Sequence, residues 1–177
     1  MSSRRRQQGL TIVEACICTA LTATLAGFGA DSFRSLREHR ALEGAAAEFE
    51  TDMMHARSLA VMHNVPIRIT FKARAEGACY VVHTGDAADC DCDAAGRTTC
   101  TGTAQAFRGV GAAAASGLSM RSTSPSILIE PTRGTVTPTT TLKLAGQSGA
   151  AVHRVVSIMG RVRGCSPDRS VPTLPAC

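Results

Sequence analysis

Residues 9–29 of the chain read GLTIVEACICTALTATLAGFG. This mostly apolar run follows a polar leader that contains Arg4, Arg5 and Arg6. A helix of about 20 residues, rising about 1.5 Å per residue, is long enough to cross a bilayer. The three arginines would hold the leader in the cytoplasm, because positive charge flanks the cytoplasmic end of membrane helices. The stretch therefore predicts a membrane-spanning helix over residues 10–29.

Two plainer interpretations of this stretch are a secretory signal, cut near Leu25-Ala26-Gly27, and a simple membrane anchor. Neither explains Glu14, whose carboxylate lies a few residues inside the apolar run. An acidic side chain at that depth is costly and is usually kept for a partner.

The hexapeptide Gly9-Leu10-Thr11-Ile12-Val13-Glu14 resembles the type III signal of type IV prepilins. The resemblance implies that a prepilin peptidase cuts after Gly9 and that the new N-terminal Leu10 is methylated. It also implies that Glu14 pairs with the N-terminal amine of a neighbouring pilin, and an opposite charge does make a buried carboxylate tolerable. The chain departs from the family at Leu10, where most members have Phe, and in the two cysteines of the anchor, Cys16 and Cys18.

The resemblance further implies a single-pass inner-membrane protein with a periplasmic C-terminal domain, incorporated into a pilus or pseudopilus. We therefore divide the chain into a prepilin leader (1–9), a transmembrane half-helix (10–29), a periplasmic half-helix (30–64), a β-rich domain (65–164) and a basic C-terminal tail (165–177).

Apolar residues between Asp31 and His63 recur at spacings that predict one buried helical stripe; they are Phe33, Leu36, Leu42, Phe49, Met53 and Leu59. Asn64 and Pro66 predict the end of this helix. Alternating or β-branched runs then predict strands, at Ile67–Phe71, Cys79–Val82, Ile127–Ile129, Thr141–Leu144 and Val152–Ile158. Residues 83–103 and the Ala/Gly-rich stretch 109–117 predict loops. A long helix followed by short strands predicts an α+β fold.

Eight cysteines are a high number for a cytosolic chain of this length. Six of them lie downstream of the apolar run and are disulfide candidates: Cys79, Cys90, Cys92, Cys100, Cys165 and Cys177. The first four would staple the 83–103 loop in some pairing, and the last two would close a loop in the tail. Zinc is the alternative, but the Cys90-x-Cys92 spacing is too tight for a zinc site and no suitable histidine pair follows.

The acidic run of this loop invites a calcium interpretation; its members are Asp86, Asp89, Asp91 and Asp93. The run lacks the spaced glycine and the terminal glutamate of an EF-hand loop, which favours a solvated acidic loop instead. We therefore expect neither a metal nor another cofactor. Scattered histidines (His55, His63, His83, His153) and no recognisable nucleophile setting argue against an enzyme.

Three further segments resemble the GspH/FimT branch of pseudopilins, at residues 54–67, 130–138 and 154–165. The resemblance covers most of the chain, is weakest from about 83 to 126, and implies a long N-terminal helix packed on antiparallel sheets.

The net charge falls from +5 to +2 when Arg4, Arg5 and Arg6 are removed with the leader. The C-terminal residues 151–177 keep a local excess, with four arginines (Arg154, Arg161, Arg163, Arg169) against Asp168. Such a segment predicts an anionic partner.

The motif Gly160-Arg161-Val162-Arg163 is the most informative part of that segment. Side chains two apart in a strand share a face, so the two arginines would point the same way. Two guanidinium groups suit adjacent phosphates, and Gly160 would let the backbone approach a partner. Arg154 and Arg169 could extend the patch.

A Gly-Arg-x-Arg motif in this position resembles that of the FimT subgroup, for which it implies DNA binding during natural transformation. Contact would run through duplex phosphates with little sequence preference, because the scarcity of aromatic residues disfavours base stacking. The alternative is a minor pilin or type II secretion pseudopilin that assists fibre assembly or sits at the fibre tip without binding nucleic acid.

Overall fold

The computed structural model describes residues 11–177, which fall into two compact units with the boundary between Arg37 and Glu38. The helix α1 (Ile12–His63) contributes residues to both units, and each unit is described by itself. The leader, Gly9 and Leu10 lie outside the described residues.

The first unit is the N-terminal part of α1. Thr11 caps it, since the Glu14 backbone N–H donates to the Thr11 hydroxyl at 3.3 Å. The hydroxyls of Thr19, Thr22 and Thr24 each donate a hydrogen bond of 2.9 Å to the backbone carbonyl four residues earlier. These bonds satisfy the hydroxyl groups without partners outside the helix. Among the described residues, no helical segment combines the length and the hydropathy needed to span a bilayer. The membrane anchor predicted over residues 10–29 is therefore not shown.

In the second unit, α1 buries a stripe with alternating spacings of four and three residues: Leu42, Ala46, Phe49, Met53, Ala56 and Ala60. Phe33 and Leu36 of the predicted stripe belong to the first unit and are exposed. The helix ends where Asn64 and Pro66 predict. Asn64 takes a positive φ of 52° and the Val65 N–H bonds back to the Ala60 carbonyl at 3.3 Å.

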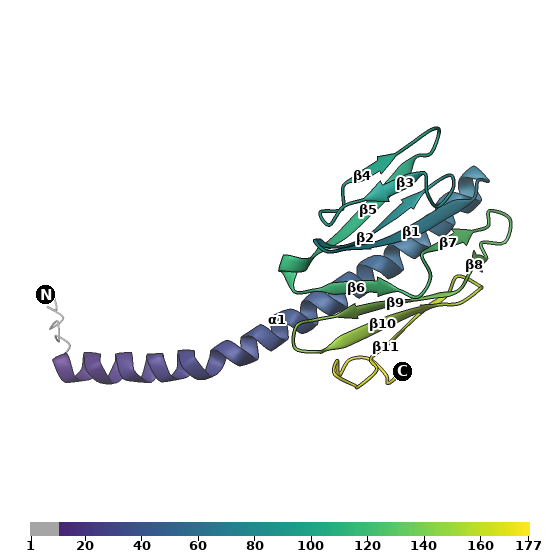
Figure 1. The fold of residues 1–177 in the computed structure, drawn as a ribbon. Coiled ribbons are helices and arrows are strands. Elements are labelled where there is room, and N and C mark those ends of the chain that lie inside the picture. Colours follow the sequence, from purple (N-terminus) through teal and green to yellow (C-terminus); the bar gives the residue numbers. More distant parts are fainter. Residues whose placement is uncertain (1–10) are drawn as a thin grey trace, which may run out of the picture. The chain divides into compact units, whose positions relative to one another are not determined.

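Two antiparallel sheets pack along this part of α1 (Figure 1). The five-stranded sheet has the order β5 (Ala106–Ala113), β2 (Gly77–His83), β1 (Ile67–Arg74), β7 (Ser126–Ile129) and β8 (Val136–Thr137). The four-stranded sheet has the order β11 (Val162–Cys165), β10 (Ala151–Val156), β9 (Thr140–Ala145) and β6 (Ser119–Ser122). The predicted α+β fold with antiparallel sheets is confirmed.

A polar cluster ties α1 to the five-stranded sheet inside an apolar core. The Tyr80 hydroxyl donates to buried Asp52 at 2.7 Å, and the Arg108 guanidinium donates to the same carboxylate at 2.7 Å. Phe49 packs edge-on against the Tyr80 ring, with 5.5 Å between the centroids. Burial, together with the Asp52 charge, raises the pKa of Tyr80 and keeps the phenol protonated as a donor.

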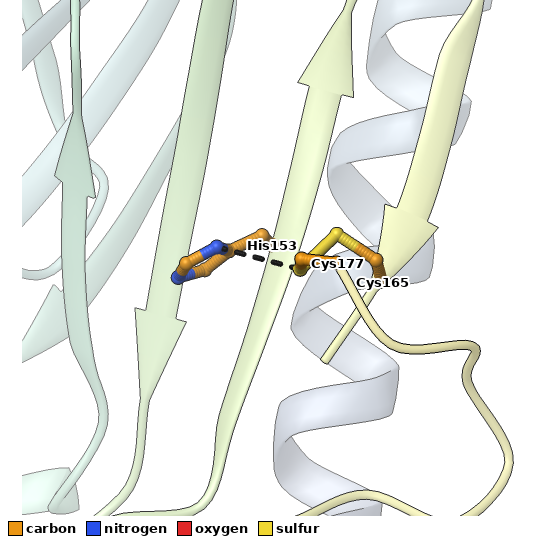
Figure 2. A group of neighbouring side chains, drawn as sticks. All are labelled: His153, Cys165 and Cys177. Atoms are coloured by element: carbon orange, nitrogen blue, oxygen red, sulfur yellow. Dashed lines mark hydrogen bonds between the residues drawn. A yellow bond between two sulfur atoms is a disulfide. The ribbon is translucent and has the colours of Figure 1, made fainter. Parts of the chain in front are cut away.

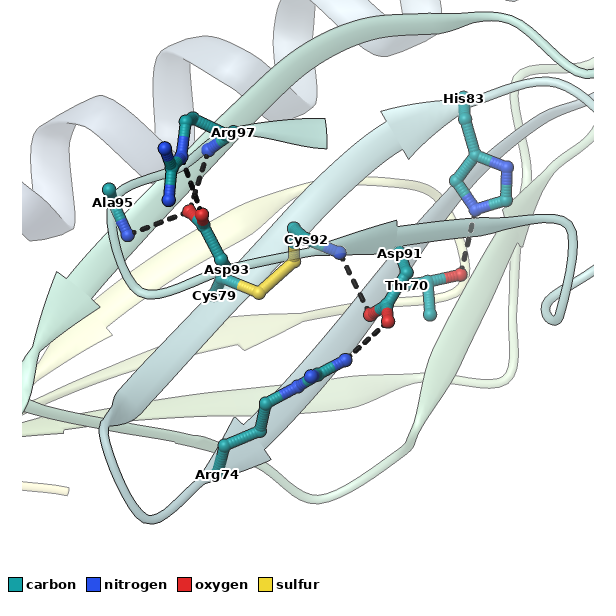
Figure 3. The surroundings of a disulfide bond; sticks show 9 residues. All are labelled: Thr70, Arg74, Cys79, His83, Asp91, Cys92, Asp93, Ala95 and Arg97. Carbon is teal, nitrogen blue, oxygen red and sulfur yellow. Dashed lines mark hydrogen bonds and ion pairs between the residues drawn. A yellow bond between two sulfur atoms is a disulfide. The ribbon is translucent and has the colours of Figure 1, made fainter. Parts of the chain in front are cut away.

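The region predicted as the 83–103 loop contains a small hairpin, β3 (Cys90–Cys92) and β4 (Thr98–Cys100). The predicted stapling is confirmed, with disulfides Cys79–Cys92 and Cys90–Cys100. Two members of the acidic run have arginine partners: Asp91 meets Arg74, and Asp93 meets Arg97 at 2.7 Å (Figure 3). Those guanidinium groups lower the pKa of both carboxyls.

The prediction of a loop over residues 109–117 is wrong, because β5 runs through its first half and a short 3₁₀ turn η1 (Ala114–Ser116) follows. The glycines mark a close approach of two backbones rather than a turn. A Cβ on Gly109 would lie 2.3 Å from the Thr98 methyl, and one on Gly111 would lie 2.3 Å from the Ala94 carbonyl oxygen. The disulfide-stapled hairpin therefore rests on a glycine-lined strand.

Candidate anion-binding surface

The turn between β10 and β11 positions the Gly-Arg-x-Arg motif. The Gly160 N–H donates to the Ser157 carbonyl at 2.8 Å, and the Ser157 N–H donates to the Arg161 carbonyl at 3.0 Å. Gly160 adopts a φ of 70°, which favours glycine. A Cβ there would also lie 2.8 Å from the Arg57 side chain. Gly160 is buried, so its role is in this turn and against Arg57, and the prediction that it exposes backbone to a partner is wrong.

Arg161 and Arg163 are exposed and lie close together. Both line a shallow hollow of about 410 Å³, together with Val155, Ser157 and Met159. In residues 11–177, neither guanidinium has an acidic side chain within ion-pair distance. The structure thus brings together the two arginines that the motif pairs, and it leaves their charge uncompensated by the described chain.

Arg154 does not join them. It is directly opposite Gly164 on β11, whereas Arg163 is opposite Val155, so the two arginines occupy opposite faces of the sheet. The Arg154 guanidinium points toward α1 and pairs with Glu50 at 3.1 Å, with only 13% of its side chain exposed. The prediction that Arg154 extends the patch is therefore wrong, because its charge is already used inside the domain.

Arg169 lies elsewhere as well. The hydroxyl of its neighbour Ser170 accepts the Ala151 N–H at 3.0 Å, which anchors this part of the tail at the start of β10. Arg161 follows the turn at the other end of that strand. The disulfide Cys165–Cys177 closes the tail, and that predicted pairing is confirmed. Arg169 therefore lies at the opposite end of β10 from Arg161, and the prediction that it extends the patch is wrong.

His153 touches this disulfide, with 3.7 Å between its Nδ1 and the Cys177 Sγ (Figure 2). His153, Cys165 and Cys177 are close enough to share a metal ion, but both sulfurs are bonded to each other and offer no thiolate. Burial, and the positive charge of Lys143, lower the pKa of His153. His153 is therefore neutral near pH 7, and it adds charge to this face only in acid.

Sequence reasoning missed two cations on the same sheet, Arg121 of β6 and Lys143 of β9, which face each other across the strand pair. The available signal was the alternation Leu142-Lys143-Leu144, in which the leucines are buried and the lysine is exposed. Of the predicted processing residues, only Glu14 is among the described residues. It lies in the first turn of α1 and is exposed.

A model of the family described as "Type II transport protein GspH" matches residues 45–160, which cover the C-terminal part of α1 and every strand except β11. The chain belongs to the GspH family. The resemblance to the GspH/FimT branch is thus confirmed at the level of this family. No curated protein matches the chain.

Two solved structures are similar to this chain. The type IV minor pilin FimU of Pseudomonas aeruginosa is similar, at a TM-score of 0.52 and 17% identity, over 71% of this chain and 89% of that one. The minor pseudopilin EpsH of the type 2 secretion system of Vibrio cholerae matches at a TM-score of 0.47 and 11% identity, over 71% and 97%. The FimU match indicates a type IV pilin-like fold, and the family is one of fibre subunits rather than of enzymes.

Proposed function

We propose that this GspH-family protein is a minor pilin that binds duplex DNA during natural transformation, through Arg161 and Arg163. One observation carries the proposal: both arginines are exposed, line the same hollow and have no acidic partner within residues 11–177. Exposed guanidinium groups without carboxylates are free to bind phosphate oxygens bidentately. The proposed site no longer includes Arg154 or Arg169.

Assembly is part of the proposal. A prepilin peptidase would cut after Gly9 and expose Leu10 for methylation, and Glu14 would pair with the amine of a neighbouring pilin. Residues 10–29 would anchor the subunit in the inner membrane before it enters the fibre, with the C-terminal unit in the periplasm. The exposed apolar side chains of α1 (Ile12, Val13, Ile17, Leu21 and Leu25) support a helix that is covered by lipid or by other subunits.

The second candidate is a secretion pseudopilin or structural minor pilin that binds no nucleic acid. The type II transport description of the family favours it. In that case, Arg161 and Arg163 would meet acidic side chains of the next subunit.

A gel-shift titration of the full chain with random-sequence duplex DNA at two salt concentrations separates the candidates. The proposal expects salt-sensitive binding that the Arg161→Ala/Arg163→Ala variant loses by about 10-fold or more, since two phosphate contacts disappear. Arg40→Ala/Arg97→Ala removes the same charge from α1 and from the β3–β4 turn, where both side chains are highly exposed. This control should bind like the wild type.

Absence of binding by folded wild-type protein at low salt would favour the second candidate. An equal loss in both double variants would mean that net charge alone drives the association. Replacing both arginines by lysine tests the bidentate geometry, because lysine keeps the positive charge but lacks the paired N–H donors of the guanidinium group.

A further inference from the structure

We propose that the whole outer face of the four-stranded sheet binds the DNA, with Arg121 and Lys143 holding the phosphate backbone that Arg161 and Arg163 hold at the hairpin end. The inference rests on the proposed function and extends it from one turn to a surface that crosses four strands. We call this surface the basic face, defined by Arg121, Lys143, His153, Arg161 and Arg163.

The strand register places these side chains together. Arg121 is directly opposite Lys143, and Lys143 is directly opposite His153. Directly opposed residues in antiparallel strands share a face of the sheet. Two residues further along β10, Val155 is opposite Arg163, and Val155 shares the face of His153. The cations of β6, β9 and β11 therefore point to the same side as His153 of β10, which is charged only in acid.

That side is the one that α1 does not cover. The intervening residues Leu142, Leu144 and Val152 are buried in the core. By contrast, Arg121, Lys143 and Arg163 are exposed and His153 is half-buried. No sheet position on the basic face carries an acid; besides the cations, these positions are Ser119, Thr141, Ala145, Ala151, Val155 and Cys165. Asp168 of the tail is the acidic group that acts on His153.

The pairing of arginines elsewhere in the domain sharpens the contrast. Among the described residues, six arginines outside the basic face each meet a carboxylate: Arg40, Arg68, Arg74, Arg97, Arg108 and Arg154. Within residues 11–177, none of Arg121, Lys143, Arg161 and Arg163 has such a partner. The basic face therefore gathers four cations without carboxylate partners on one side of a single sheet.

The arrangement also costs stability. Like charges directly opposite each other in a sheet, such as Arg121 and Lys143, are destabilising. A polyanion laid across the strands would offset that repulsion. The basic face spans three inter-strand gaps of about 4.8 Å, or about 14 Å, and duplex DNA carries one charge for about every 1.7 Å of its axis. Several phosphates can therefore be engaged at once.

The edge of the basic face continues toward the five-stranded sheet. Arg121 and Lys72 both line a hollow of about 180 Å³ beside β6. No aromatic side chain lines this hollow except Phe71, which packs against Phe49 in the core. The surface is thus suited to the sugar–phosphate backbone rather than to stacked bases.

The test compares three double variants of the full chain in the same salt titration: Arg121→Ala/Lys143→Ala, Arg161→Ala/Arg163→Ala and the control Arg40→Ala/Arg97→Ala. We expect Arg121→Ala/Lys143→Ala to weaken binding by about 10-fold and to lower the slope of log affinity against log salt by about 2, because each lost phosphate contact removes about 0.9. Urea unfolding verifies the fold of each variant. Arg121→Gln/Lys143→Gln replaces the first variant if it is unstable.

A footprint on the wild type gives a second readout. Lys72 and Lys143 are the only lysines of the sequence, so acetylation followed by mass spectrometry reports on few sites. DNA should protect Lys143. Three results together would overturn this inference: Arg121→Ala/Lys143→Ala binds DNA like the wild type, DNA does not protect Lys143, and Arg161→Ala/Arg163→Ala still loses affinity. They would leave the proposed site at Arg161 and Arg163 intact. Absence of binding by the wild type would overturn both.

Discussion

Arg154 and Arg163 lie on adjacent strands of one sheet and face opposite ways. Arg154 is opposite Gly164 and reaches Glu50 of α1 at 3.1 Å, whereas Arg163 is opposite Val155 and is exposed. The two arginines therefore have different roles: Arg154 links the sheet to α1, and Arg163 is available to a partner. Exchanging the roles would require a one-residue shift of register, which turns every side chain of the strand to the other face.

The two arginines should respond oppositely to truncation. Arg154→Ala leaves the Glu50 carboxylate without its partner and should lower the free energy of unfolding by about 1–3 kcal/mol. DNA affinity of the folded variant should stay within about two-fold of the wild type. Arg163→Ala should do the reverse, with near wild-type stability and weaker binding. Urea unfolding and gel shift of both variants check this. A large loss of affinity in folded Arg154→Ala would contradict the division of roles.

Gly160 should tolerate no side chain, for two separable reasons. Gly160→Ala places a Cβ at a φ of 70° and 2.8 Å from the Arg57 side chain. Gly149→Ala also meets a positive φ, of 90°, but its Cβ would have nothing within 4 Å. We expect Gly149→Ala to cost about 1 kcal/mol of stability and Gly160→Ala about 2 kcal/mol or more, the difference arising from contact with Arg57. Equal costs in thermal unfolding would mean that Arg57 moves freely aside.

The tail disulfide should be a stability element. Cys165 and Cys177 are 12 residues apart, and the segment between them inserts Val171 fully into the core. Cys165→Ser/Cys177→Ser should lower the free energy of unfolding by about 2–4 kcal/mol and raise hydrogen exchange around Val171. The wild type treated with a reductant serves as an independent comparison. Unchanged exchange at Val171 would show that the Ser166 and Ser170 hydrogen bonds suffice to hold the tail.

His83 should make the domain sensitive to acid. The ring is fully buried, contacts the Thr70 hydroxyl at 2.8 Å and the Thr84 carbonyl at 2.8 Å, and its burial lowers its pKa. The unfolded chain therefore takes up a proton at higher pH than the folded one. Stability should be full above about pH 6.5 and should fall as the pH decreases below it, by up to about 1.4 kcal/mol per pH unit until His83 itself protonates.

The measurement is urea unfolding between pH 8 and pH 5. His83→Gln should be less stable at pH 8 but show a flatter profile, since the titrating group is gone. His153, whose pKa is also lowered, titrates in the same direction, so His153→Gln is the matched comparison. If His153→Gln reduces the pH dependence of the unfolding free energy more than His83→Gln does, the acid sensitivity arises at His153, beside the tail disulfide, instead.

Much of the fold could be predicted from local pattern. The helical stripe through Leu42, Phe49 and Met53, the helix end at Asn64 and Pro66, and the main strand positions all follow from periodicities of 3.6 and 2 residues. The strand β5 could not be predicted in this way. Its glycines, Gly109 and Gly111, are typical of a loop by composition and are explained only by the hairpin packed over them.

The candidate site was likewise predictable in part from local pattern and in part only from the tertiary structure. The sequence by itself determined that Arg161 and Arg163 share a side, because residues two apart in a strand always do. It also determined that six cysteines were available to pair, but not which of 15 arrangements forms. The tertiary structure alone decided that Arg154 faces α1, that Arg169 sits at the far end of β10, and that Arg121 and Lys143 join the basic face. The physical reason is that a local pattern fixes which residues of one strand share a face, whereas the register and neighbours of that strand decide what each face meets.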